Sequence, residues 1–281
     1  MFRLKIVPDD TAINFMRPWK FTFGLSMALV VASIVLFFTI GLNFGIDFRG
    51  GTSIRSEATQ AVDIGAYREA IAPLGLGDVS ISEVFDPTYG PERNVAMIRI
   101  QAQGDGDAVP PALLSQVEAA LQTHDATLHF TSVESVGPKV SGELVQDALL
   151  AVMTALGAIL IYIWLRFEWQ FALGAVAALV HDLILTIGIF VVLQLRFDLT
   201  TIAALLTIVG YSINDTVVVF DRVRENLIKY KQRDVAEVMN LSLNETLTRT
   251  LMTSFTTLIA LIALAVLGGD VIRGFVFAMI W

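Results

Sequence analysis

The stretch VGYSINDTVVVF, residues 209–220, is apolar at both ends and carries Asn214 and Asp215 near its middle. It belongs to an apolar segment, 198–221, that is long enough to cross a lipid bilayer. An aspartate at the centre of a spanning helix costs roughly 2.5–3.5 kcal/mol, whereas a favourable Leu or Val contributes only about 0.3–0.6 kcal/mol. The stretch therefore predicts a membrane protein in which Asp215, placed within a span at an energetic cost, has a functional role.

The composition of the whole chain agrees with a membrane protein. Of its 281 residues, 55% are hydrophobic and only 16% are charged, and the apolar residues occur in long runs. There is no cysteine, which excludes disulfides and thiolate chemistry. The sequence also lacks a P-loop, a nucleophile elbow and a zinc-type cluster, and His124 and His129 have no partners at ligand spacing. We therefore expect no enzyme activity, no bound metal and no cofactor.

Runs of apolar residues predict an α-helical, polytopic fold with five complete spans. The first run lacks an A-x-A cleavage site after it and exceeds a signal peptide in length, so we expect an uncleaved anchor. The last apolar segment, 271–281, rises only about 15 Å as a helix. We expect it to be the incomplete start of a sixth helix, with a short re-entrant end as the alternative. The predicted spans are 21–44, 143–166, 169–195, 198–221 and 246–268.

The basic residues predict the orientation of the chain. They gather in the tail 1–20 and in the loop 222–244: Arg3, Lys5, Arg17, Lys20, Arg222, Arg224, Lys229, Lys231 and Arg233. The short loops on the opposite side carry Arg196 and Arg273. By the positive-inside rule the N-terminus is cytoplasmic and the long segment 45–142 is external. We expect the mixed charges of 222–240 to form an amphipathic helix on the cytoplasmic surface.

The external segment 45–142 reads as a small soluble domain. Alternating strands and two amphipathic helices follow in the order strand-helix-strand-strand-helix-strand, with a hairpin turn at PTYGPE, residues 87–92. This order predicts an α+β sandwich of the ferredoxin-like type. A fold this common carries no functional information.

The polar residues of the spans suggest a proton pathway. Tyr211, Ser212 and Asp215 share one helix face, and burial favours the protonated form of a carboxyl group. Asp215 is therefore a candidate for taking up and releasing a proton, with Asn214 beside it. In the alternative, Asp215 lies about 8 Å from the end of the span and is solvated at the cytoplasmic interface.

Three further polar residues belong to the same hypothesis. His181 and Asp182 lie near the middle of the third span, and their side chains must diverge because successive helical residues point about 100° apart. They either carry protons or pack as buried hydrogen-bonded groups. Arg249 begins the fifth span and either reaches the interface or pairs with Asp215. A stripe of threonines at helical spacing, typical of helix–helix contacts, runs along the same segment: Thr246, Thr250, Thr253 and Thr257.

The segment GIDFRGG, residues 45–51, lies at the predicted membrane exit. Its glycines, Gly45, Gly50 and Gly51, allow tight backbone turns, and Asp47 and Arg49 are expected to pair at the interface. We predict a hinge here between the membrane helices and the external domain.

Three motifs resemble one known family. GIDFRGGT at 45–52, VGYSINDTVVVFDRVREN at 209–226 and LNETLTRTLMTS at 243–254 resemble the signatures of the SecD/SecF family of protein-export membrane proteins, and the second motif favours its SecF branch. The resemblance extends over nearly the whole chain. It implies a six-helix plan similar to that of resistance-nodulation-division transporters, in the bacterial inner membrane, with a periplasmic domain.

The resemblance also implies function and partners. Members pair with SecD, work beside the SecYEG channel, SecA and YajC, and use the proton-motive force to help preproteins emerge on the periplasmic side. Nucleic acid is not among the expected partners. The family residues implicated in proton transport match Asp215 and Arg249 here.

One departure from the family bears on this expectation. Many relatives have an acidic residue where this chain has Gly274, so a relay that needs this carboxyl group requires SecD to supply it. Two other functions stay open: an autonomous antiporter of protons and small molecules, and a passive scaffold of the export channel.

Overall fold

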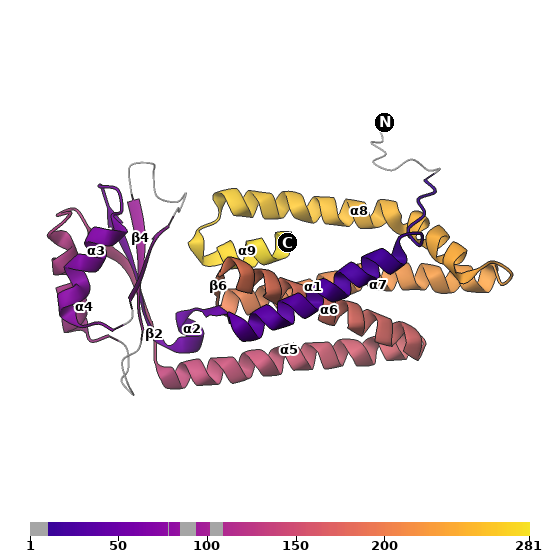
Figure 1. Cartoon of the computed structure of the whole chain (residues 1–281), viewed down its shortest axis with the longest axis horizontal. Helices are drawn as coiled ribbons and strands as arrows, with labels where there is room; N and C mark the ends of the chain where they lie inside the picture. The colour runs from indigo at the N-terminus through magenta and orange to yellow at the C-terminus, as the bar shows by residue number, and fades with distance from the viewer. Residues whose placement is uncertain (1–10, 78, 85–93, 102–108) are drawn as a thin grey trace.

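The computed structural model describes residues 11–77, 79–84, 94–101 and 109–281. The tail residues Arg3 and Lys5 and the predicted turn at PTYGPE lie outside these ranges. The described chain forms an elongated molecule, with a helical half at one end and a small α/β domain at the other (Figure 1).

Five of the described helices are long and apolar enough to cross a membrane. They run roughly side by side along the molecule (Figure 1), and much of their apolar surface is exposed, as lipid contact requires. Their bounds are α1 Trp19–Thr39, α5 Pro138–Arg166, α6 Trp169–Leu193, α7 Leu199–Lys229 and α8 Val235–Leu267.

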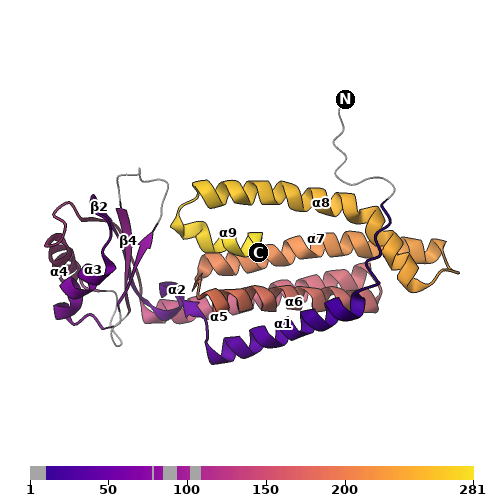
Figure 2. The same cartoon turned by 45° about the horizontal axis from the view of Figure 1, so that its top comes forward.

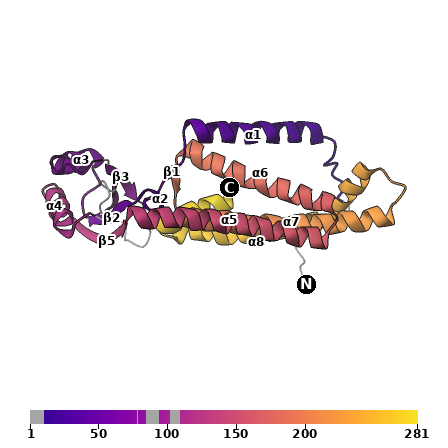
Figure 3. The same cartoon turned by 90° about the horizontal axis from the view of Figure 1, so that it is seen from below.

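Helix α6 is the most buried span. It contacts α1, α5 and α7, and α1 lies beside it at the edge of the bundle (Figure 3). The close approach of α1 depends on Gly188, because an added Cβ atom there would collide with the side chain of Ser33. Small residues of this kind let helix backbones approach within membranes.

The last described segment is also helical. The 3₁₀ turn η2, Asp270–Ile272, leads into α9, Arg273–Ile280, which lies between α7 and α8 (Figure 2). Its buried Ala278 packs in the same apolar cluster as Leu205 and Val209 of α7. This cluster joins α6, α7 and α9.

The segment predicted to be external, called the external domain from here on, has the predicted order of elements. Four antiparallel strands form a sheet in the order β3-β4-β2-β5, and α3 and α4 pack on one face. Ile54, Ile98 and Leu121 lie at the centre of its core. The bounds are β2 Gly51–Ala58, α3 Ile64–Ile71, η1 Ala72–Leu74, β3 Val79–Val84, β4 Asn94–Gln101, α4 Pro111–Gln122 and β5 His129–Val136.

Short elements connect the two halves. Strand β1, Asn43–Phe44, pairs in parallel with β6, Arg196–Phe197, in the α6–α7 turn. The one-turn helix α2, Ile46–Arg49, follows β1 and leads through Gly50 into the external sheet. The first span therefore ends at Thr39, before the predicted boundary at 44, because Gly41 turns the chain with φ +77°.

The predicted surface helix over 222–240 is not a separate element. Helix α7 continues to Lys229 and α8 begins at Val235, so the segment forms the ends of two spans and the turn between them. Polar contacts between the helices explain this: Arg222 and Asn226 of α7 bind the Glu245 carboxylate, at 2.6 and 2.7 Å.

Candidate functional site

A cavity of about 480 Å³ lies among α6, α7 and α9. Both Asp182 and Asp215 line it, and so does the hydroxyl-bearing face of α7. The buried hydroxyl of Tyr211 has no hydrogen-bond partner among the described residues. Since liquid water occupies about 30 Å³ per molecule, a cavity of this size that is lined by two carboxyl groups can hold several waters. The lining residues are Asp182, Leu185, Thr186, Ile208, Tyr211, Ser212, Asp215, Thr216, Ala278, Met279 and Trp281.

Asp215 is half-buried on the cavity side of α7, where the helical spacing predicts it with Tyr211 and Ser212. The exposed Asn214 lies 3.4 Å from its carboxylate. From α8, the positive charge of Arg249 acts on the same carboxylate. Among the described residues, Asp215 and Arg249 do not form an ion pair at contact distance. The attraction between Asp215 of α7 and Arg249 of α8 therefore acts over more than ion-pair distance.

His181 and Asp182 connect three helices. Ser26 of α1 and the His181 Nε2 atom share a 2.6 Å hydrogen bond, and His181 Nδ1 lies 3.0 Å from the Asp182 carboxylate. Ser212 of α7 donates a 2.7 Å hydrogen bond to the other carboxylate oxygen of Asp182. The two side chains diverge as expected, His181 toward α1 and Asp182 toward α7. A hydrogen-bonded chain thus runs from α1 to the cavity.

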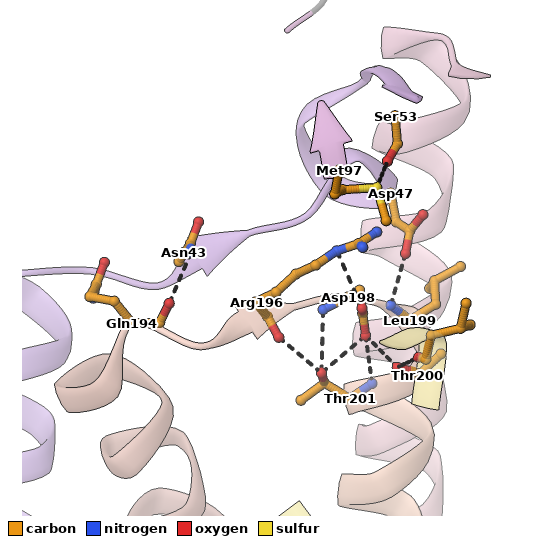
Figure 4. Close-up of polar contacts among 11 residues, drawn as sticks. Asn43, Asp47, Ser53, Met97, Gln194, Arg196, Asp198, Leu199, Thr200 and Thr201 are labelled. Carbon is orange, nitrogen blue, oxygen red and sulfur yellow. Dashed lines mark hydrogen bonds and ion pairs between the residues drawn. The ribbon is translucent and has the colours of Figure 1, made fainter. Parts of the chain in front are cut away.

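At the membrane exit, two carboxylates lie at the N-terminus of α7 (Figure 4). The Asp198 carboxylate accepts a hydrogen bond from the backbone N–H of Thr201 at 3.0 Å, and the Thr201 hydroxyl oxygen accepts one from the backbone N–H of Asp198. These two reciprocal bonds make a capping box. Asp47, from the GIDFRGG segment, accepts from the backbone N–H of Leu199 at 3.0 Å. Negative charge is favourable at this end of a helix. The exit segment is therefore attached to the helix that carries Asp215.

The predicted pair between Asp47 and Arg49 is wrong. Both residues lie in α2, where positions two apart point about 200° away from each other. The Asp47 carboxylate instead reaches Leu199, which is 152 residues away in sequence.

The three glycines of the exit segment have separate roles. The N–H of Gly45 donates to the Phe197 carbonyl at 2.8 Å, and an added Cβ atom at Gly45 would lie 3.1 Å from Arg196 Nε. Gly50 and Gly51 have φ angles of +73° and +129°, which favour glycine. The first allows close packing and the other two allow the turn into the sheet.

Several polar contacts were not anticipated from the sequence. Ser26 gave no signal, because it is a single hydroxyl in an apolar run. Asp198 did have a signal, since an Asp before an apolar periodic segment is a typical helix start. In the LNETL motif, Asn244 accepts from the Ile13 N–H, and Asn240 nearby accepts from the Met16 N–H, both at 2.9 Å. These asparagines hold the segment before α1 against α8.

Two family descriptions match the chain. "Protein export membrane protein SecD/SecF, C-terminal" covers residues 116–281, and "SecD/SecF GG Motif" covers residues 35–62. The "Protein translocase subunit SecF" of Cereibacter sphaeroides is 62% identical over 99% of this chain and 86% of that protein. The protein of the same name from Rickettsia bellii is 39% identical over 98% of this chain and 88% of its own length.

Solved structures agree with these matches. The crystal structure of SecDF from Thermus thermophilus, described as a translocon-associated membrane protein, superposes with a TM-score of 0.84 at 34% identity. The match covers 96% of this chain and 36% of the SecDF chain. A second SecDF structure, in a super-membrane-facing form, matches with a TM-score of 0.70. This chain therefore spans about a third of the SecDF polypeptide.

Proposed function

The chain belongs to the SecD/SecF family of protein-export membrane proteins, and we propose that it is the SecF-type subunit of a bacterial Sec machinery. In this proposal it pairs with SecD and uses the proton-motive force to drive late translocation and release of preproteins. It lies in the inner membrane with its N-terminus in the cytoplasm, and its ferredoxin-like domain is periplasmic. SecYEG, SecA and YajC are the proposed neighbours in the machinery.

The observation that supports the proton step is the cavity lined by the carboxyl groups of Asp215 and Asp182. A carboxyl group that meets a cavity of this size can exchange protons through water, which a carboxyl group packed against lipid cannot. The Tyr211 hydroxyl and the Ser212 hydroxyl extend the polar lining between the two aspartates. The cavity makes the passage of protons across this part of the bundle chemically reasonable.

In the proposed cycle Asp215 alternates between a protonated and an ionised state, and Arg249 stabilises the ionised state. The ionised Asp215 carboxylate is attracted to the positive charge of the Arg249 guanidinium on α8. Protonation removes the negative charge and so weakens the contact between α7 and α8. One charge moved through 100 mV provides about 2.3 kcal/mol, which is comparable to the cost of placing Asp in a span. The gradient is therefore strong enough to bias the two helices.

SecD is proposed to complete the pathway. This chain covers about a third of the matched SecDF polypeptide, which leaves room in a complex for a second helical half. Gly274 of α9 has no carboxyl group to offer, so any acidic group needed near it comes from SecD in this proposal. The chain itself does no covalent chemistry and takes no cofactor.

Asp215→Asn tests the proposal. The variant is assembled with SecD in membrane vesicles, and preprotein release is followed with and without a proton gradient. We expect loss of the gradient-dependent part with complex assembly unchanged. Asp221→Asn is the matched control, because Asp221 lies on the same helix but is exposed and pairs with Arg166 at 3.1 Å.

Two other outcomes have distinct meanings. Full gradient-dependent release by Asp215→Asn would refute the proton role and favour a passive scaffold. Gradient-driven transport of small molecules by the chain without SecD would favour an autonomous antiporter.

A further inference from the structure

Helix α1 contributes one hydroxyl group to the hydrogen-bonded chain that leads to the cavity. The Ser26 hydroxyl lies 2.6 Å from Nε2 of His181, and Nδ1 of the same ring lies 3.0 Å from the Asp182 carboxylate, which lines the cavity. We propose that Ser26 is a positioning residue for the proton step: it acts through His181 and holds Asp182 at the cavity in both protonation states of the imidazole ring. This inference rests on the proposed function and deepens it.

The packing of α1 directs Ser26 toward α6. Helix α1 lies along the edge of the bundle, where it packs on α6 (Figure 3). Between residues 21 and 39 the side chains that are not exposed form one narrow stripe at helical spacing: Ser26, Val30, Ser33 and Leu36. Of the two hydroxyls in this stripe, that of Ser33 packs against Gly188 and that of Ser26 bonds to His181. The contact with the ring is therefore a specific feature of one position on the stripe.

A hydroxyl group is suited to a histidine that changes its protonation state. It has one donor and two acceptor positions, and its hydrogen atom can rotate, whereas an ammonium group only donates and a methyl group does neither. When Nε2 of His181 carries no proton, it accepts a hydrogen bond from the Ser26 O–H. When Nε2 carries a proton, it donates to the Ser26 oxygen. The contact is thus kept when the ring gains or loses a proton, and α1 does not have to move.

The other nitrogen of the ring acts on the carboxylate. Nδ1–H of His181 donates to one oxygen of the ionised Asp182, and Ser212 of α7 donates to the other oxygen at 2.7 Å. Holding the ring at Nε2 therefore also holds the Asp182 carboxylate between α6 and α7. The other titratable side chains in the described lining of the cavity are Tyr211 and Asp215. The neighbouring spans contain no charged residue over these ranges of α1, α5 and α9: 21–39, 148–165 and 274–281.

The contact also determines which helix responds to a change in charge. Helix α1 is attached to α6 within the span by Ser26, and just beyond its end by Asn43, which donates to the Gln194 carbonyl at 2.9 Å. Because the Ser26 contact is kept in both protonation states, α1 stays docked on α6. A change in the charge of Asp182 then acts mainly on α7, through the hydrogen bond from Ser212.

The test follows the ring and the export reaction separately. The chain has three histidines, and two of them, His124 and His129, lie in the external domain, so replacing both by Gln leaves the signal of His181 alone. Nitrogen NMR of the full-length chain, labelled with ¹⁵N-histidine and reconstituted in lipid bilayers, reports the hydrogen bond at Nε2. Ser26→Ala should shift the Nε2 resonance. In vesicles with SecD it should lower gradient-driven preprotein release about fivefold, the effect of losing one hydrogen bond. Ser26→Thr keeps the hydroxyl and should restore both.

Ser33→Ala is the matched control, because it makes the same change on the same stripe of α1 at a position that packs against Gly188. It should leave both the resonance and the release as in the wild type, and an equal loss of release in Ser33→Ala and Ser26→Ala would assign the effect to packing and overturn the inference. An unchanged Nε2 resonance in Ser26→Ala would overturn the contact itself. Full release by Ser26→Ala, with release lost in Asp215→Asn, would overturn this inference and leave the proposed function standing.

Discussion

The contact between Asp47 and the start of α7 gives the sharpest prediction about how the two halves are joined. Asp47→Ala removes the acceptor of the Leu199 N–H and one negative charge at the helix N-terminus. Loss of a capping acceptor costs about 1 kcal/mol, and loss of the favourable charge costs about 0.3–1 kcal/mol more. We therefore expect the start of α7 to open about ten- to thirtyfold more often, because 1.4 kcal/mol is a factor of ten.

Amide hydrogen exchange in lipid nanodiscs measures this opening directly. The exchange rate of the Leu199 amide should rise by the same factor in Asp47→Ala. Asp47→Asn keeps an acceptor oxygen and loses only the charge, so it should raise the rate about two- to fivefold. An exchange rate that increases from wild type to Asp47→Asn to Asp47→Ala would separate the contribution of the hydrogen bond from that of the charge.

Asp63→Ala is the control, because Asp63 caps α3 in the external domain by accepting from Ala66 at 3.0 Å. It should raise exchange at α3 and leave the Leu199 amide unchanged. If exchange at Leu199 were the same in wild type and Asp47→Ala, the contact would be energetically irrelevant, and the proposed attachment of the exit segment to α7 would be refuted.

Three further variants test packing, pH dependence and the cavity. Gly188→Ala should destabilise the α1–α6 contact by about 1–3 kcal/mol through collision with Ser33, seen as a lower thermal midpoint that Ser33→Gly restores. Hydrogen bonds from the Thr127 hydroxyl and amide lower the pKa of the Asp125 carboxyl group below its ordinary 3.8. The ionised carboxylate therefore stabilises the folded protein above pH 3.8, and this contribution is lost as the pH falls through the lower pKa of the folded state. Urea unfolding should therefore show Asp125→Asn less stable than wild type at pH 6, with the difference shrinking below pH 3.8; a constant difference would contradict this. Tyr211→Phe should leave the thermal midpoint unchanged, because the hydroxyl has no partner among the described residues, but should slow gradient-driven release several-fold; equal release would remove Tyr211 from the pathway.

The sequence predicted the membrane spans because apolar runs are a local property. It failed at their ends, where α7 and α8 continue through polar residues. Those ends are stabilised by contacts between helices, such as Arg222 with Glu245 at 2.6 Å, across 23 residues of sequence. Hydropathy along one segment carries no information about a partner on another segment.

The same limit applied to the candidate site. The inward face of α7 followed from helical spacing, and the divergence of His181 and Asp182 followed from the 100° step. The hydrogen-bond partners of these residues could not be predicted from the sequence, because they lie far away in it: Ser26 is 155 residues from His181. Asp47 was assigned to Arg49 because the two are close in sequence, whereas the structure assigns it to a backbone amide 152 residues away. Chemical type and periodicity predicted which face of a helix a residue occupies better than which residues it contacts.

The position of the proposed hinge follows from what is attached to each side of it. Helix α2 is held to the helical half by Gly45, which donates to Phe197 at 2.8 Å, and by Ser141 of α5, which donates to the Ile46 carbonyl at 3.3 Å. The next residues, from Gly51 onward, belong to the external sheet. A bend at the proposed hinge would therefore fall at the two glycines with positive φ, Gly50 after α2 and Gly51 at the start of β2.

The second connection between the halves leaves the sheet beside the first. Val136, the last residue of β5, pairs with Gly51, and Gly137 then leads directly into α5. The two connections, at Gly50–Gly51 and at Gly137, therefore lie next to each other and define one axis. The sheet can tilt about this axis while α2 and α5 stay attached to the bundle. Because α2 also carries Asp47 at the start of α7, a change in α7 acts on the chain next to this axis. The architecture thus favours a tilt of the external domain over a change in its internal fold.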